Sequence, residues 1–529
     1  SGYATPLCRR TGPPAGRNAM TPDRRARLSW LHRWAGLVSS WAIYTITLTG
    51  TLAVFDTELT RWMQPQTAVV PPGSTATPAA LEQARRILVD DEAHGLPAAF
   101  VRLPGPRDPT LRIERFDGHS FTGPVLDPRD GHRIAAPHTE GGTFFFDLHY
   151  SLRVPRPWGQ RLVAAFTFVF AIELLGGILI HLARIVPDYF TLRLRAALPR
   201  FLLDVHVLTG TAMLPFHIMV TYTGLILAAD NALPVLGRAG RTPPPRPTVA
   251  GHWAPATPLA PLLDQTRALS GHEPEHLRFS PGQVVVFATR PGSLTLDRVS
   301  ITFDAGTGRV LDMPAGQGRP RPDLAQRATA LAHGLHMGRT MEPMLRWFWF
   351  AGGLASTVMV ASGLLFYTAR RRASAALGPA VAFERLNAGV LAGLPCACLV
   401  YLYLNRLAPC VSPAWPGVAT GGFFATWLGC ILLTSLAAPH RGWRAILLGT
   451  AALGLATPLL DVLSAPDARA EFSTSPALFA TVDGLCVLAG IVAGFIAFYG
   501  QRPGRTHGSK GRRAAPSAPC LPTGEKAGP

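Results

Sequence analysis

The chain has 529 residues, of which 48% are hydrophobic, and its formal net charge is +18. The apolar residues gather in runs of roughly 20, the length that crosses a bilayer, so the composition excludes an ordinary soluble enzyme. The basic charge does not indicate a nucleic-acid partner, because the arginines lie in every second segment between apolar runs, as the positive-inside rule predicts for a membrane protein.

About eight apolar runs predict membrane-spanning helices. Because arginine-rich segments stay in the cytoplasm, both termini are predicted to be cytoplasmic. The predicted spans are Ala35–Phe55, Leu162–Leu182, Leu203–Ala228, Leu345–Thr368, Leu386–Leu404, Val418–Ala438, Ala445–Val462 and Ala477–Tyr499.

The first four spans form a tandem repeat, in which a span, an outward segment of roughly 100 residues and a second span occur twice. Each outward segment carries a helical pattern, strand-like runs and an aspartate–glycine turn, so it predicts a small α+β domain. The helical patterns are Ala79–Asp91 and Leu259–Ser270, and the strand patterns are Ala99–Leu103, Leu111–Phe116, Gln283–Thr289 and Asp297–Asp304.

The predicted fold is therefore a mainly α membrane protein with a four-helix tandem-repeat core, two small periplasmic α+β domains and about four additional C-terminal transmembrane helices. Its parts are an N-terminal tail (1–28), repeat 1 (29–185, with its domain at about 64–140), repeat 2 (203–372, with its domain at about 250–322), a C-terminal bundle (384–500) and a disordered basic tail (501–529).

Histidines at the edges of the apolar runs form two matching pairs. His32 and His206 each open a span in the form His-x-x-x-Gly, and His149 and His336 each precede a span. An imidazole at a membrane boundary is costly unless something coordinates or hydrogen-bonds it. A duplicated set of such rings indicates ligands for a metal or for haem, and the alternative is a boundary ring bonded to a lipid headgroup or a carbonyl.

Three further histidines leave the pairing open. His181 lies at the cytoplasmic end of its span and competes with His32, while His333 is an alternative to His336 on the outer side. His217 follows His206 by eleven residues, about 16 Å along nearly the same helix face. It is either a ligand or a polar packing residue hydrogen-bonded to Thr221 or Tyr222.

Each of the other polar groups near the spans has two alternative interpretations. Glu173 lies in the middle of a span, where a carboxyl group is expensive, and is either a proton-relay group or a structural hydrogen-bond donor. The arginines nearest to the histidines either neutralise haem propionates or extend to the membrane interface. They are Arg33, Arg153, Arg184 and Arg339.

These features resemble the PepSY-associated transmembrane proteins. The helix, strands and Asp-x-x-x-Gly turn between His-bearing spans carry the resemblance, and it covers roughly residues 24–372. The runs Ile180–Arg193 and Pro215–Gly224 are similar to those of the subgroup that contains inner-membrane ferric-siderophore reductases of the ferrioxamine-reductase type. Spans five to eight lie outside the resemblance.

The resemblance implies an oxidoreductase of the bacterial inner membrane with two b-type haems. One haem is expected between His206 and either His32 or His181, and the other between His149 and His336, with His333 and His217 as further candidates. Two imidazoles hold iron in a form that passes single electrons. The implied acceptor is a ferric siderophore in the periplasm.

The electron donor and the function class have alternatives. The chain has no Gly-x-Gly-x-x-Gly after a strand and no cytoplasmic domain large enough for a nucleotide, so membrane quinol or a separate reductase is the expected donor. A second hypothesis is a non-catalytic PepSY membrane protein that binds or regulates a peptidase or envelope partner. A third is a siderophore or iron permease.

Overall fold

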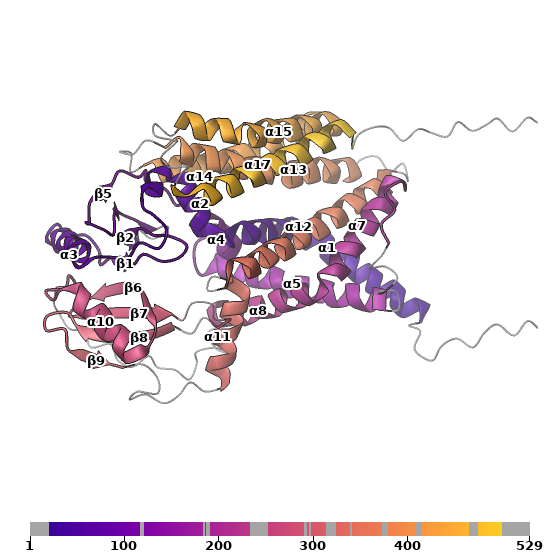
Figure 1. The fold of residues 1–529 in the computed structure, drawn as a ribbon. Coiled ribbons are helices and arrows are strands. Elements are labelled where there is room, and N and C mark those ends of the chain that lie inside the picture. Colours follow the sequence, from indigo (N-terminus) through magenta and orange to yellow (C-terminus); the bar gives the residue numbers. More distant parts are fainter. Residues whose placement is uncertain are drawn as a thin grey trace, which may run out of the picture.

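The computed structural model is a bundle of long helices with a β-sheet at one end (Figure 1). It describes residues 21–116, 121–182, 186, 191–232, 252–289, 294–295, 298–313, 324–338, 341–372, 379–408, 414–464 and 474–499. Helix α1 begins and α17 ends at the end of the bundle opposite the sheet (Figure 1). We call this the termini side and the opposite end the sheet side.

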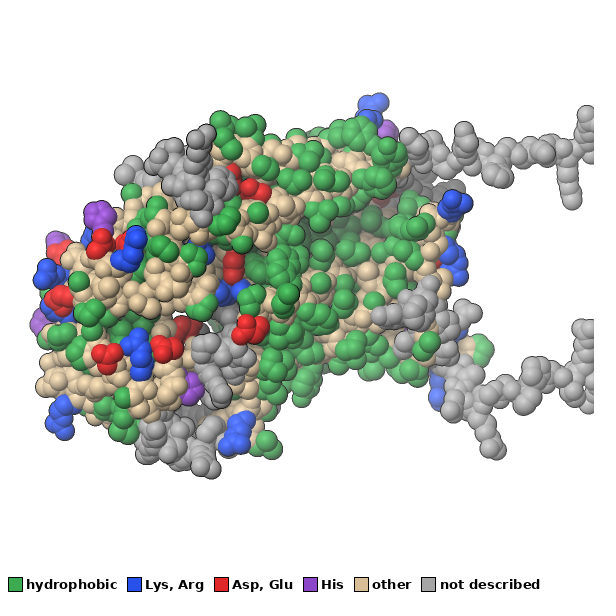
Figure 2. Space-filling view, viewed as in Figure 1, with side chains coloured by type: hydrophobic (Ala, Val, Ile, Leu, Met, Phe, Trp, Pro, Cys, Tyr) green, Lys and Arg blue, Asp and Glu red, His purple; other side chains and the backbone are tan. Residues whose placement is uncertain are grey.

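The distribution of side chains over the surface is that of a membrane protein. Hydrophobic side chains cover the flank of the bundle, whereas charged side chains gather at its two ends (Figure 2). Within the described residues, six helices are long and apolar enough to cross a bilayer, or eight if each of two bent helix pairs counts as one span. The mainly α fold class is confirmed.

The two repeats contribute equivalent helices to one core. Repeat 1 supplies a long first helix, a short helix on the sheet side and a second long helix, and repeat 2 supplies the same series with its first helix broken. The first helix of each repeat packs on the second helix of both repeats. The elements are α1 (Pro22–Ala53), α4 (Thr143–Ser151), α5 (Trp158–His181), α7 (Leu198–Ala212), α8 (Leu214–Ala232), α11 (Leu324–Met337) and α12 (Pro343–Arg372).

The third predicted span is not one straight helix. The axes of α7 and α8 differ by 70°, with the break at Met213. Pro215 lies just beyond the break and has no N–H to donate to the carbonyl of Thr211, so the helical ladder cannot continue there. The prediction of an unbroken helix over Leu203–Ala228 was therefore wrong. The end of α1 is also bent, by 71°, into α2 (Asp56–Met63).

The outward segments of both repeats share one antiparallel sheet. The described strands follow the order β5-β4-β2-β1-β6-β7-β8-β9, with β3 beside β2. The junction is β1 against β6, where Val101 faces Leu277. The strands are β1 (Phe100–Arg102), β2 (Leu111–Phe116), β3 (Phe121–Thr122), β4 (Val125–Leu126), β5 (Arg133–Ile134), β6 (Glu273–Ser280), β7 (Gln283–Thr289), β8 (Arg298–Asp304) and β9 (Val310–Asp312).

One apolar core joins the two halves of this sheet. Helices α3 (Pro78–Ala93) and α10 (Leu259–Ser270) contact each other and bury side chains of both repeats in one cluster. The predicted helices and four predicted strands correspond to α3, α10, β1, β2, β7 and β8. Strand β6 was missed, because Pro274 and its charged neighbours mask the alternation of Leu277 and Phe279.

The four additional C-terminal helices form a bundle that packs on repeat 1 and on α12. Two hydrogen bonds join α1 to the bundle: the indole of Trp41 donates to Asn387 over 2.7 Å, and the hydroxyl of Tyr44 donates to the carbonyl of Leu391 over 2.8 Å. The helices are α13 (Pro379–Arg406), α14 (Trp415–Leu436), α15 (Pro439–Ser464) and α17 (Pro476–Tyr499).

Candidate functional site: two pairs of facing histidines

On the termini side of the core, His32 of α1 faces His206 of α7. Their ring centroids are 6.2 Å apart and the ring planes are inclined by 64°. The two residues come from different repeats and are brought together because α1 and α7 both pack against α12. We call them the termini-side pair.

On the sheet side, His149 of α4 faces His336 of α11. The ring centroids are 6.0 Å apart and the planes are inclined by 34°. Each residue lies near the C-terminal end of its short helix, which packs against the first helix of its own repeat. We call them the sheet-side pair.

All four rings are held in the same manner. The Nδ1 atom of each ring lies 2.7–3.1 Å from a backbone carbonyl of a neighbouring helix, and a carbonyl can only accept a hydrogen bond, so Nδ1 carries the proton. The Nε2 atom of each ring then keeps its lone pair. The donor and acceptor residues are His32 and Glu173, His149 and Ile46, His206 and Met359, and His336 and Val220.

A glycine lies four residues after each accepting carbonyl. In a helix, the side chain at position i+4 lies beside the carbonyl of residue i, so a Cβ atom there crowds a ring that contacts this carbonyl. The crowding is tight at Gly50, Gly224 and Gly363, whereas a Cβ on Gly177 would make an ordinary contact of 3.6 Å with His32. A Cβ atom on Gly50 would lie 2.6 Å from Nδ1 of His149, and one on Gly363 would lie 3.0 Å from Nδ1 of His206. The carbonyl and glycine positions are Glu173 and Gly177, Met359 and Gly363, Ile46 and Gly50, and Val220 and Gly224.

The sequence interpretation missed these glycines. Apolar spans contain many glycines, so none of the four is distinctive alone. The signal lies in their spacing: Gly50 follows His32 by eighteen residues, and Gly224 follows His206 by the same eighteen. Aligning the two repeats on His32 and His206 would have revealed it.

A cavity of about 640 Å³ surrounds the termini-side pair. Its walls are mostly apolar and include glycines of all four neighbouring helices, and its volume lies in the range typical of small-ligand sites. Arg33 of α1 and Arg370 and Arg371 of α12 also line it, and all three are exposed on the termini side. The cavity therefore combines apolar walls with a cationic end.

The remaining candidate histidines are not in the pairs. His181 lines the wall of the same cavity, so it lies near His32 and His206. His333 turns to its own helix, where Nδ1 lies 3.0 Å from the carbonyl of Thr329. His217 is fully buried, and neither of its ring nitrogens has a hydrogen-bond partner within the described residues, so the bond to Thr221 or Tyr222 that we considered does not form.

The polar residues singled out near the spans have specific partners. Glu173 accepts a hydrogen bond from the hydroxyl of Ser39 over 2.5 Å, and its backbone carbonyl accepts the bond from His32. Arg153 forms an ion pair with Glu140 over 2.6 Å. Its guanidinium, which we considered for a haem propionate, is therefore already paired. The other two arginines of that prediction, Arg184 and Arg339, lie outside the described residues.

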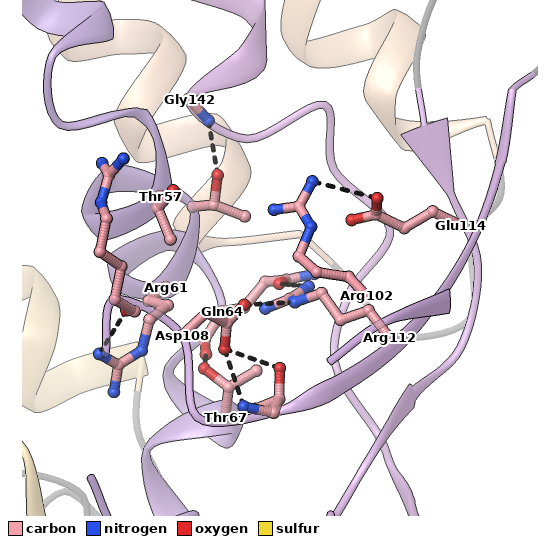
Figure 3. A network of polar contacts seen from close by, with 12 residues as sticks. Thr57, Arg61, Gln64, Thr67, Arg102, Asp108, Arg112, Glu114 and Gly142 are labelled. Carbon is pink, nitrogen blue, oxygen red and sulfur yellow. Dashed lines mark hydrogen bonds and ion pairs between the residues drawn. The ribbon is translucent and has the colours of Figure 1, made fainter. Parts of the chain in front are cut away.

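A polar network ties the sheet to the start of α4, which carries His149. Arg112 of β2 donates to Asp108 over 2.6 Å and to Gln64 over 2.9 Å (Figure 3). Gln64 directly follows α2, and Thr60 of that helix accepts a hydrogen bond from the backbone N–H of Gly142, the residue that caps α4. The orientation of His149 is thus linked to the sheet through α2.

The electrostatics of this network favour an ionised Asp108. Burial opposes the charge, but the guanidinium of Arg112 and two hydrogen bonds from Thr110 outweigh it and hold the pKa of Asp108 below its ordinary value. The buried ion pair is therefore formed at neutral pH.

Protein side chains alone do not build a conventional metal site in the part of the chain that the structure describes. No group of three or more His, Cys, Asp or Glu residues there is arranged to hold an ion. The four paired rings instead form two sites of two imidazoles each.

The fold and these sites define a multi-pass helical membrane protein with duplicated imidazole pairs. A model of the PepSY-associated TM region matches residues 29–370. The chain belongs to this family, and the C-terminal bundle lies beyond the matched region. No curated protein matches the chain.

Proposed function

We propose that the protein is a haem-containing electron conduit of a bacterial inner membrane, which reduces ferric siderophores on the periplasmic side. The sheet side would face the periplasm and the termini side the cytoplasm. The arginines on the termini side support this orientation through the positive-inside rule.

The geometry of the two pairs carries the proposal. Two imidazoles on opposite sides of one metal ion, each bound at about 2 Å, have ring centroids about 6 Å apart. The observed separations are 6.2 Å and 6.0 Å. Each ring also donates Nδ1–H to a carbonyl, which is the arrangement that orients a ligating histidine and raises the basicity of its other nitrogen.

The cavity of the termini-side pair supports a planar cofactor there, and the sheet-side pair repeats the arrangement of two imidazoles. At the termini-side site, His32 and His206 would hold the haem iron, the glycine-lined walls would admit the ring system, and Arg33, Arg370 and Arg371 would neutralise the propionates. At the sheet-side site, His149 and His336 would be the ligands. A haem with two imidazole ligands supplies one-electron transfer without ligand rearrangement.

The depths of the two sites suit transfer across a bilayer. His149 contacts the carbonyl of Ile46, which follows His32 by fourteen residues on the unbroken helix α1. At 1.5 Å per residue the two sites lie about 21 Å apart along α1, which is most of the thickness of the hydrocarbon layer. Electrons entering on the termini side would leave beneath the sheet.

The acceptor would bind between the sheet and the sheet-side ends of the helices. Ferric iron is held by hard oxygen ligands much more tightly than ferrous iron, so delivery of one electron at this end would weaken the chelate and release the metal.

The absorption spectrum of the purified full-length protein tests the proposal. We expect a Soret band, sharp α and β bands after dithionite reduction, and two haems per chain in a pyridine haemochrome assay. A colourless preparation from haem-replete cells would contradict the conduit and would favour a non-catalytic protein that binds an envelope partner.

A further inference from the structure

Two buried polar groups on α8 lack partners. The ring of His217 is fully buried, and both of its nitrogens are without a hydrogen bond within the described residues. The hydroxyl of Thr221, one turn further along, is likewise buried and unpartnered there. The Gly210 carbonyl faces the His217 ring without meeting hydrogen-bond geometry. Buried polar groups are costly unless they are satisfied, so these two indicate a missing partner.

The position of these groups is between the two histidine pairs. Three residues before His217, Leu214 lines the cavity of the termini-side pair, and three residues after it, Val220 accepts the hydrogen bond from His336. His217 also lies in the first turn of α8, just beyond the break between α7 and α8. Broken helices within membranes commonly surround binding sites, because irregular backbone is tolerated where it lines a cavity.

The fold itself does not need a polar residue at this place. The corresponding residue of repeat 1 is Ile43, which precedes Ile46 by the same three residues that separate His217 from Val220, and Ile43 packs in the apolar core with 3% exposure. An isoleucine therefore suffices in one repeat, whereas the other repeat buries an imidazole. This difference points to a role in binding.

The site is adjacent to the lipid-facing surface of α8. Ile218 is 47% exposed and Tyr222 is 65% exposed, and each directly follows one of the two unpartnered residues. A ligand dissolved in the bilayer would reach His217 and Thr221 by passing between these side chains. Such a ligand must be uncharged, since a charged one would not partition into the hydrocarbon layer.

We propose that His217 and Thr221 bind the head group of a membrane hydroquinone, which is the electron donor of the conduit. This inference rests on the proposed function. His217 and Thr221 are four residues apart and lie on one helix face, so both reach the same oxygen of the ring. The unprotonated ring nitrogen of His217 accepts a hydrogen bond from the quinol hydroxyl. The hydroxyl of Thr221 donates a hydrogen bond to a lone pair of the same quinol oxygen.

The oxidation of one hydroquinone is balanced by the reduction of two ferric chelates. One hydroquinone gives up two electrons and two protons and becomes a quinone. The electrons pass one at a time by way of the histidine pairs to two ferric chelates, each of which is reduced to the ferrous state. The first proton moves from the quinol oxygen to the nitrogen of His217, and both protons finally pass to water.

The test uses the full-length protein in nanodiscs with decylubiquinol and a short-chain menaquinol as probes. Three variants are compared: His217→Ile, which copies the residue of repeat 1; Thr221→Val; and Thr47→Val as the matched control, since Thr47 is the repeat 1 counterpart of Thr221 and bonds to the carbonyl of Tyr44. Stopped-flow absorbance gives the rate of haem reduction by each quinol, and dithionite gives the total reducible haem.

We expect the His217→Ile variant to lose about tenfold or more of the quinol-driven rate, and Thr221→Val to lose several-fold, while Thr47→Val stays at the wild-type rate. The haem reduced by dithionite should be unchanged in all three. A wild-type quinol-driven rate in His217→Ile would overturn the proposal.

Calorimetric binding of oxidised decylubiquinone separates this proposal from the proposed function, because it requires no electron transfer. Binding that is lost in His217→Ile supports the site even if the preparation holds no haem. If wild-type protein carries haem but binds neither oxidised decylubiquinone nor the oxidised form of the short-chain menaquinol, the conduit stands and the quinol site is overturned, with buried water as the partner of His217.

Discussion

The ring of His149 donates a hydrogen bond over 2.8 Å to the carbonyl of Ile46, on the same helix that carries His32. A single continuous helix therefore carries one ring of the termini-side pair and the carbonyl that anchors a ring of the sheet-side pair. The spacing between the two sites is set by the rise of α1.

A side chain at Gly50 should displace His149. An added Cβ would lie 2.6 Å from Nδ1 of the ring, a separation that real contacts do not show, so Gly50→Ala must push the imidazole away from Ile46. We expect a loss of about half of the bound haem by pyridine haemochrome. Gly449→Ala on α15, where an added Cβ meets nothing within 4 Å, is the control. Full haem content in Gly50→Ala would refute the anchoring role.

Removal of one imidazole of the termini-side pair should have a selective effect on haem content. His206→Ala should abolish haem at this site and halve the haem content, because one imidazole in an apolar cavity does not keep a six-coordinate iron. His181→Ala, which alters the wall of the same cavity, should retain both haems. Difference spectra of the reduced proteins distinguish the two variants, and equal haem loss in both would show that His181 is also a ligand.

The stability of the sheet should depend on pH through Asp108. Its pKa is lowered in the folded state, so its ion pair with Arg112 contributes stability above the ordinary value of about 3.9, and that contribution is lost as the pH falls through the lower folded value. As the pH falls below about 3.9, we expect the protection factors of the β2 amides, which are corrected for the intrinsic pH dependence of exchange, to decrease in the wild type.

Asp108→Asn is the matched test of that dependence. The amide keeps the shape but not the charge, so the variant should exchange faster at pH 7 and show a smaller change on acidification. The cost at neutral pH should be about 1–3 kcal/mol, because the pair is buried. A pH profile identical to that of the wild type would rule out Asp108 as the responsible group.

The C-terminal bundle should depend on the ion pair of Arg406 with Asp461. The two side chains are fully buried and 3.2 Å apart, and Arg406 also donates to the carbonyl of Trp62. Arg406→Leu leaves the carboxyl without its counter-charge and should destabilise the protein by about 3–5 kcal/mol. The double variant with Asp461→Leu should recover much of this loss in a thermal melt. No recovery would mean that the bond to Trp62 dominates.

The sequence predicted the histidine pairs because duplication makes them visible. His32 with His206, and His149 with His336, occupy equivalent places in two copies, and the topology of four spans brings such places together. The glycine anchors depend on a carbonyl in another helix, a relation that no single segment displays. The break at Met213 was missed because the hydropathy of Leu203–Ala228 continues through Pro215. His217 was left open because its neighbours depend on that break.

Each histidine pair takes one ring from each repeat, and the β1–β6 junction likewise joins the two halves of the sheet. One repeat expressed alone would therefore contain two imidazole rings without their partners and an unpaired strand edge. Two such halves, related by a twofold axis, would be needed to complete both histidine pairs. Because one polypeptide carries both repeats, the two need not be identical, and repeat 2 holds His217 where repeat 1 holds Ile43.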